Sequence, residues 1–300
     1  MNKQIVFGLS IVVLNVLLAV FAPLIATHEV DEMDFLYIFA KPGEGGHILG
    51  TDDYGRDIFS RLIYGSRISL IVGVIAVGIG ALVGTVLGII AGYFGGLFDA
   101  VLMRFMDALL SFPYVLLAIA MMAVLGAGLF NAMLAIGIVM VPSFSRIVRS
   151  AVLNIKSEEF VLAARALGAS HLWIIFHHVI PNIVPVLIVY SSLNFSGAVI
   201  SEATLSFLGL GIQPPTPSWG SMLAEARNYL QTAPHMAIFP GFAILLTCLG
   251  FNGFERSSGS KTEELRGRKN EGKDRTGCGL NERRINRSGE KDIQNCRALL

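Results

Sequence analysis

Hydrophobic residues fall in long runs that contain almost no charge. The first run covers residues 5–26, and a helix of about 22 residues is about 33 Å long, enough to cross a bilayer. The stretch 108–145 is too long for one span, and the glycines at 126 and 128 interrupt it near the middle. Further runs cover residues 69–93, 183–208 and 236–251. The pattern therefore predicts an all-α membrane protein with six transmembrane helices.

The polar connections between these helices predict their orientation. The connection between the fourth and fifth helices contains Arg146, Arg149, Lys156 and Arg165, whereas residues 27–67 carry eight acidic and four basic side chains. Basic loops tend to stay on the cytoplasmic side of a membrane. We therefore expect residues 27–67 to be external, and the basic loop and both chain termini to be cytoplasmic.

Residues 158–182, within this basic connection, have the local pattern of two short helices. Ser157 can cap the first helix, and Gly168 supplies a left-handed stop. Ser170 can cap the second helix, which Pro181 is expected to end. The sequence thus predicts a structured loop on the cytoplasmic side.

One face of the first loop helix forms a small apolar ridge. Helical spacing brings together Phe160, Ala163, Ala164 and Leu167, with Glu159 beside them. Such a ridge suits a groove on another protein. The alternative is a helix that lies on lipid head groups, which Trp173 would suit. The pattern alone leaves both interpretations open.

The second predicted transmembrane helix carries a glycine at every fourth position. The stripe consists of Gly80, Gly84, Gly88 and Gly92. In lipid, stripes of small residues let helix backbones approach closely and gain packing contacts. We therefore predict a helix-packing seam, with a narrow pore wall as the alternative.

The fifth predicted helix has one polar face, within an arc of roughly 120°. Its members are Ser191, Asn194, Ala198, Glu202 and Ser206. A glutamate at mid-bilayer costs about 2.5–3.5 kcal/mol on insertion scales, so Glu202 should face protein or water. This face either bonds helices together or lines a translocation path through Ser191, Asn194 and Glu202.

Composition supports a membrane protein and sets the C-terminal end apart. Hydrophobic residues make up 53% and charged residues 15% of the chain, with a mean hydropathy of +0.63. The net charge is only +1, but basic residues are unevenly distributed: 12 of the 23 Lys and Arg residues lie in positions 253–300. That segment has too few apolar residues to bury a core, so we expect disorder. It is either a basic tail that touches anionic lipid or an altered terminus.

The sequence predicts no catalytic, metal or cofactor site. The nucleotide-binding pattern G-x-x-x-x-G-K-[ST] is missing, because "SSGSKT" at 257–262 lacks its second glycine. The chain is therefore not expected to be an enzyme or to bind ATP or nucleic acid. Asp52, Asp53 and Asp57 do not follow the calcium-loop pattern, and the three cysteines have neither disulfide nor metal spacing.

Three motifs resemble a known family. "AARALGA", with Pro181 following 13 residues after its glycine, resembles the EAA loop of binding-protein-dependent ABC importer permeases. It departs from the family at Leu162, where glutamate is common, and at His178. "GTDDYGRDIFSR" (50–61) and "EATLSFLGLGIQPPTPSWGSML" (202–223) resemble the second permease subunit of dipeptide, oligopeptide and nickel importers.

The resemblance, over about residues 1–252, implies a type I ABC importer permease fold in the cytoplasmic (inner) membrane. It implies a first helix and external segment at 1–65, a permease core at 66–252 with a coupling loop at about 150–182, and a separate tail at 253–300. It also implies a second permease subunit as heterodimer partner, two ABC ATPase subunits that bind ATP and Mg²⁺, and an extracytoplasmic solute-binding protein. The ATPase-coupling residues would be Glu159, Phe160, Ala163, Ala164, Leu167, Gly168 and Pro181.

The implied cargo is a di- or oligopeptide. Importers of glutathione and of nickel complexes share these motifs and remain alternatives. From another class of protein, a non-transporting membrane sensor or assembly protein could use the same ridge to bind an unrelated partner.

Overall fold

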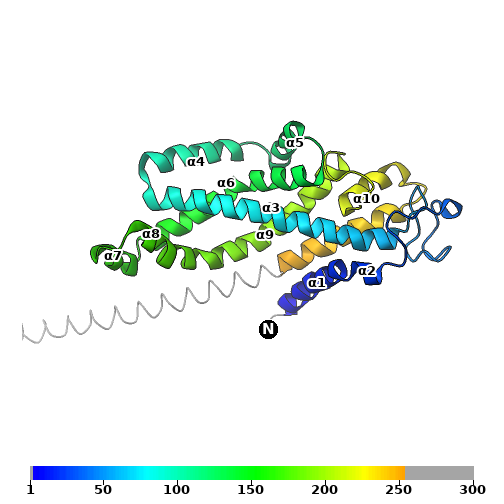
Figure 1. Cartoon of the computed structure of the whole chain (residues 1–300), viewed down its shortest axis with the longest axis horizontal. Coiled ribbons are helices and arrows are strands. Elements are labelled where there is room, and N and C mark those ends of the chain that lie inside the picture. The colour runs from blue at the N-terminus through cyan, green and yellow to red at the C-terminus, as the bar shows by residue number, and fades with distance from the viewer. Residues whose placement is uncertain (1–2, 254–300) are drawn as a thin grey trace, which may run out of the picture. The chain divides into compact units, whose positions relative to one another are not determined.

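The computed structural model describes residues 3–253, and this part of the chain is helical almost throughout (Figure 1). Within it there is no named strand, and one isolated β-bridge joins Thr51 to Asp57. The all-α prediction is therefore confirmed. The predictions about the polar tail fall on residues 254–300, outside the described part.

The helices follow one another with short connections, apart from two longer polar segments. In chain order they are α1 (Lys3–Val20), α2 (Ala22–Ile25), the 3₁₀ turn η1 (Phe35–Tyr37), α3 (Ile58–Phe94), α4 (Gly96–Leu110), α5 (Tyr114–Leu125), α6 (Leu129–Lys156), α7 (Glu159–Ala166), α8 (His171–Ile174), the π-helical turn η2 (Ile175–Val179), α9 (Ile180–Phe207), α10 (Trp219–Ala226), the 3₁₀ turn η3 (Arg227–Tyr229) and a last helix, His235–Gly253.

Four of these helices are long and apolar enough to cross a membrane. They are Ile58–Phe94, Leu129–Lys156, His171–Phe207 and His235–Gly253. The pair α4 and α5 gives a fifth crossing if its two helices, bent by 94°, are counted as one span. The apolar part of α1, Val6–Val20, is shorter than the four long helices. Six apolar segments are therefore present, although not all are single straight spans.

Several predicted boundaries were wrong. The second predicted helix begins at Ile58 instead of residue 69. The third segment begins at Gly96 instead of residue 108, and it bends at Pro113, whose ring cannot continue α4. The helix predicted to end at Pro181 instead continues into α9. The π-helical turn η2 precedes it, and Pro181 occupies the first turn of α9, where a missing N–H is tolerated.

The contact between α3 and α6 is the most extensive contact between two helices, and the glycine stripe lies in it (Figure 1). A Cβ atom at Gly80 would lie 2.7 Å from the Cβ of Met140, and one at Gly84 would lie 2.5 Å from the Cβ of Phe144. Gly88 and Gly92 face α6 in the same way. The lack of a side chain at these four positions of α3 is thus what lets the two backbones approach each other.

Apolar clusters hold the other helices to this pair. The largest lies where α3, α6 and α9 meet and includes Ala76, Met140 and Val199. A second surrounds Val161 of α7 and Val179, and we call this region the α7 end of the protein. A third cluster includes Met222 of α10, and we call that region the α10 end.

The seam predicts that a side chain at Gly84 destabilises the protein. We expect Gly84→Val to lower the free energy of unfolding by about 1–3 kcal/mol, because overpacking forces the two helices apart. The matched control is Gly78→Val on the same helix, where nothing lies within 4 Å of an added Cβ. Thermal unfolding in detergent measures both, and equal melting temperatures for the two variants would contradict the seam.

Candidate functional site

The ridge predicted on the loop helix is mostly exposed. Leu167 is 88% exposed and Phe160 43%, and Ala163 is exposed beside them. Ala164 is the exception, because it is partly buried and packs on the second cluster. Val161, fully buried, anchors the opposite face of α7. The chain thus offers Phe160, Ala163 and Leu167 as an apolar surface that its own core does not cover.

Local hydrogen bonds shape the turn after α7. Gly168 has a φ of +82°, in the left-handed region, and the Ala169 N–H donates to the Ala164 carbonyl at 3.0 Å. The Ser170 hydroxyl accepts from the Trp173 N–H at 3.3 Å. The predicted left-handed stop at Gly168 and the predicted cap at Ser170 are therefore both confirmed. Ser157 was wrongly predicted as a cap. Its hydroxyl instead donates to the Asn154 carbonyl, at the end of α6.

Other predicted loop residues lie around this turn. Glu159 is exposed in the first turn of α7, and Pro181 is exposed at the start of α9. Neither has a side-chain hydrogen bond or ion pair in the described part of the chain. They therefore belong to the accessible surface around the ridge.

Polar contacts tie the α7 end to α3. The Tyr93 hydroxyl lies 3.1 Å from His171 Nδ1, and Lys156 Nζ donates to the Tyr93 carbonyl at 2.5 Å. Between α4 and α6, Arg149 Nη2 donates to Asp99 at 2.6 Å. Arg149 and Lys156, two of the basic residues that predicted the orientation, therefore also bond α6 to its neighbours α4 and α3.

Glu202 of α9 is fully buried among three serine hydroxyls. Ser206 and Ser218 each donate to Oε1 at 2.9 Å, and Ser69 of α3 donates to Oε2 at 3.2 Å. We call Glu202 with Ser69, Ser206 and Ser218 the serine cage. The cage joins α3, α9 and the cap of α10, since Ser218 is also the N-cap of α10.

The other predicted path residues are more accessible than Glu202. Ser191 and Asn194 are partly buried, and the Asn194 amide donates to the Tyr190 carbonyl within α9 at 2.7 Å. Glu202 is closed off from solvent by its serine partners. In this conformation the polar face of α9 is therefore closed at its Glu202 end.

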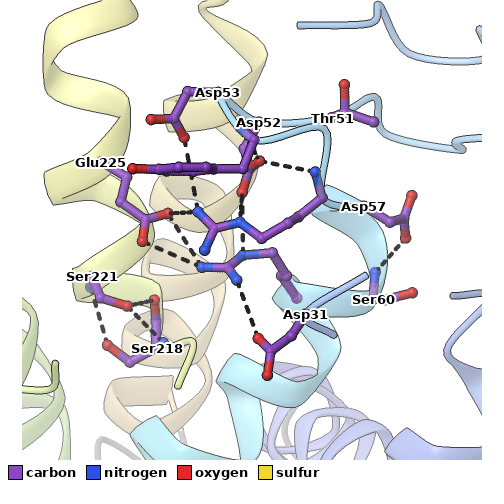
Figure 2. Close-up of polar contacts among 12 residues, drawn as sticks. Asp31, Thr51, Asp52, Asp53, Asp57, Ser60, Ser218, Ser221 and Glu225 are labelled. Atoms are coloured by element: carbon purple, nitrogen blue, oxygen red, sulfur yellow. Dashed lines mark hydrogen bonds and ion pairs between the residues drawn. The ribbon is translucent and has the colours of Figure 1, made fainter. Parts of the chain in front are cut away.

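A buried ionic cluster lies beside the cage, at the start of α3 (Figure 2). Arg56 donates to Asp52 at 2.6 Å and to Glu225 of α10 at 3.0 Å. Arg61 lies 3.2 Å from Glu225 and 3.5 Å from Asp52. We call these four residues the arginine cluster. It fastens the segment before α3 to α10.

Burial shifts the pKa of two acids in and beside this cluster. Burial raises the pKa of the Glu225 carboxyl above its usual value, against the opposing effect of the Arg61 and Arg56 charges. Burial also raises the pKa of Asp53. Asp52, Asp53 and Glu225 are close enough to hold a metal ion, but the two guanidinium groups already bind these carboxylates. The arrangement is an ion-pair network, and it does not suit a cation site.

Sequence reasoning missed Glu225, Ser69 and Ser218. Glu225 is 164 residues from Arg61, and Ser69 is 133 residues from Glu202. Ser218 is only 16 residues from Glu202, but an irregular loop separates the two. The one local signal was the spacing of Asp52 and Arg56, four residues apart. A lone glutamate on a short helix after a proline-rich loop carries no signal for its partner.

Two family models match the chain. Residues 84–262 match the model described as binding-protein-dependent transport system inner membrane component. Residues 1–42 match the N-terminal transmembrane domain of oligopeptide transport permease C. The first match contains the ridge, the serine-cage residues of α9 and α10, and three glycines of the stripe.

Relatives match over most of their length. The dipeptide transport system permease protein DppC of Alkalihalophilus pseudofirmus is 47% identical over 251 residues, 84% of this chain and 82% of the relative. The glutathione transport system permease protein GsiD of Escherichia coli is 46% identical over 242 residues, 80% of each chain. A chain of the MetNI methionine ABC transporter, solved in inward-facing conformations, is similar in fold. Its TM-score is 0.54 at 18% identity, over 68% of this chain and 97% of that chain.

The arginine cluster predicts a large effect from removing one charge. We expect Glu225→Gln to lower the free energy of unfolding by about 3 kcal/mol, because the two buried guanidinium groups would then share Asp52, with Asp53 and Asp31 no closer than 3.8 Å. Glu32→Gln, at an exposed acid in the polar segment before α3, is the matched control. Thermal unfolding in detergent measures both variants, and a Glu225→Gln protein as stable as the control would show that the cluster contributes little.

Proposed function

The chain belongs to the family of binding-protein-dependent transport system inner membrane components, and on that premise we propose that it moves short peptides into the cell. As a member, it is a membrane-embedded permease subunit of an ABC transporter. The observation that carries the peptide assignment is the identity of 47% with a dipeptide permease over 84% of the chain. Glutathione is the second candidate cargo, because a glutathione permease is almost equally similar.

The proposed orientation places the α7 end in the cytoplasm and the α10 end outside. The basic side chains at the α7 end support it, because basic loops favour the cytoplasmic side. Both termini then lie in the cytoplasm, and the membrane is the cytoplasmic, or inner, one. The division at 65 and 252, with the permease core between, belongs to the same proposal.

The ridge is the proposed ATPase contact. Leu167 and Phe160 expose apolar surface beside a helix that Val161 anchors in the core. When a partner covers an exposed leucine and the aromatic ring beside it, the burial of apolar surface lowers the free energy of the complex. A P-loop ATPase with ATP and Mg²⁺ would seat α7 in a groove, and closure of the ATPase pair would move α7 and the helices bonded to it.

The remaining partners complete the proposed assembly. A second permease subunit would form the other half of the pore, and two ATPases would bind one ridge each. An extracytoplasmic solute-binding protein would deliver the peptide at the α10 end. This chain's part is to convert ATPase closure into a change of access.

The translocation path is proposed to run along Ser191, Asn194 and Glu202. A peptide carries charged ends, so its path must offer polar partners. Because the serine cage closes this face in the present conformation, transport requires the cage to open. Hydroxyl donors to a carboxylate can be replaced by water once the helices separate.

The ATPase contact is tested by Leu167→Asp. The side chain is 88% exposed, so the substitution leaves the core intact and places a carboxylate in the apolar contact. We expect at least a tenfold loss of co-purified ATPase and of dipeptide uptake by the reconstituted complex. Leu36→Asp, at a leucine 90% exposed in the segment before α3, is the matched control.

Two outcomes would contradict these assignments separately. Wild-type ATPase recovery and uptake in Leu167→Asp would remove the ridge from the contact. If the wild-type complex hydrolyses ATP but transports neither dipeptide nor glutathione, the contact stands and the peptide cargo is wrong.

Opening of the cage is tested by thiol labelling. In a variant whose three native cysteines are replaced by serine, Ser206→Cys changes the cage by one atom. We expect a membrane-impermeant reagent to label it during ATP hydrolysis and to leave it unlabelled at rest, because Ser206 is buried here. Ile200→Cys, on the exposed apolar face of α9, should stay unlabelled in both states. Equal labelling of Ser206→Cys with and without ATP would contradict the opening.

A further inference from the structure

Two histidines and an aspartate meet between α2 and the start of α3, outside the arginine cluster and the cage. His28 follows α2, His47 lies in the polar segment before α3, and Asp57 is the N-cap of α3. His47 and Asp57 are buried, and the His28 side chain is 29% exposed. Sequence spacing gave no sign of the group, because His28 and His47 lie 29 and 10 residues before Asp57.

The three side chains converge on one oxygen atom. His47 Nδ1 lies 3.0 Å from Asp57 Oδ1, and His28 Nδ1 lies 3.8 Å from the same oxygen. The two imidazole rings stack with centroids 4.5 Å apart. One ligand atom from each of the three residues lies within 4.8 Å of the others.

The capping role of Asp57 accounts for the other oxygen. Oδ2 accepts from the Ser60 N–H at 2.8 Å and from the Thr27 hydroxyl at 3.3 Å. Capping therefore needs neither histidine. Among the described residues, no lysine or arginine lies within 4.0 Å of this carboxylate, unlike the acids of the arginine cluster. The negative charge of Oδ1 is thus faced only by two imidazole nitrogens.

We propose that His28, His47 and Asp57 form a binding site for a divalent zinc-type cation. Two imidazoles and one carboxylate form a ligand set that binds zinc at about 2.0–2.2 Å. Tetrahedral ligands at that distance are about 3.3 Å apart, and the two separations of 3.0 and 3.8 Å lie on either side of this value. Small side-chain shifts would centre an ion.

The ligand chemistry selects among metals. Imidazole nitrogens suit zinc, nickel and copper, whereas magnesium and calcium prefer several oxygen ligands. A single carboxylate is too few for calcium. The exposed edge of His28 leaves a side open for a water molecule as fourth ligand and for entry of the ion. The bound ion would fasten the segment after α2 to the first turn of α3.

The experiment uses the full chain in lipid nanodiscs, purified with an affinity tag that contains no histidine. Zinc titration by calorimetry, with elemental analysis after dialysis, should give one Zn²⁺ per chain and a raised melting temperature, with no response to Mg²⁺. His28→Ala and His47→Ala should each weaken binding by at least about tenfold, because each removes a direct ligand. His177→Ala, at an exposed histidine stacked on Trp173 at the α7 end, should bind zinc as the wild type does.

His28→Ala guards against misfolding as a cause, because His28 is the most exposed of the three ligands and caps no helix. Its melting temperature without zinc should equal that of the wild type without zinc. No saturable zinc binding by the wild type, or binding that both histidine variants retain, would overturn the proposal. His47 would then serve only as a hydrogen-bond partner of the capping carboxylate, and His28 as a partner of the Thr27 hydroxyl, which lies 3.1 Å from its Nδ1.

Discussion

The close approach of α3 and α6 is the constraint on which the other contacts depend. In a bilayer no hydrophobic force draws helices together, so their association depends on backbone proximity and dispersion contacts. Gly80 and Gly84 let the α6 side chains rest directly on the α3 backbone. The contact is reciprocal, because a Cβ on Gly137 of α6 would lie 2.8 Å from the Cβ of Ile79. A rigid pair of helices is the result.

This pair links the two ends of the protein. α3 has 37 residues and is therefore about 55 Å long, well beyond the thickness of a bilayer. Arg61 near its start belongs to the arginine cluster, Ser69 about two turns later belongs to the serine cage, and Tyr93 at its end contacts His171. A displacement of α7 can therefore reach the cage and the cluster through one helix. The route consists of specific side-chain contacts of α3.

Local sequence patterns predicted the local features, and distant pairings escaped them. The glycine stripe, the stop at Gly168 and the cap at Ser170 depend on spacings of a few residues, so they could be predicted. Ser206 is on the same helix as Glu202, but Ser69, Ser218 and the arginine partners of Glu225 come from other segments of the chain. The sequence indicates that a buried charge needs a partner, and it does not identify that partner. The predicted end at Pro181 was wrong because the π-helical turn Ile175–Val179 leads directly into α9, and Pro181 fits in the first turn of that helix. The bend at Pro113 was missed because the apolar run continues through it.

The kinds of contact in the molecule differ in how easily they can separate. The glycine seam between α3 and α6 is close-packed. Separating the two helices would leave a void, or lipid that does not fit their surfaces, so α3 and α6 are suited to move together as one body. The serine cage consists of hydrogen bonds, which contribute only about 0.5–1.5 kcal/mol each when water can replace them. Glu202 accepts hydrogen bonds from hydroxyls of α3, α9 and the α10 cap, so water that entered between these helices would replace its donors. A permease needs one boundary that holds and one that opens. Under the proposed function, the glycine contacts between α3 and α6 would form the first boundary, and the serine contacts around Glu202 would form the second.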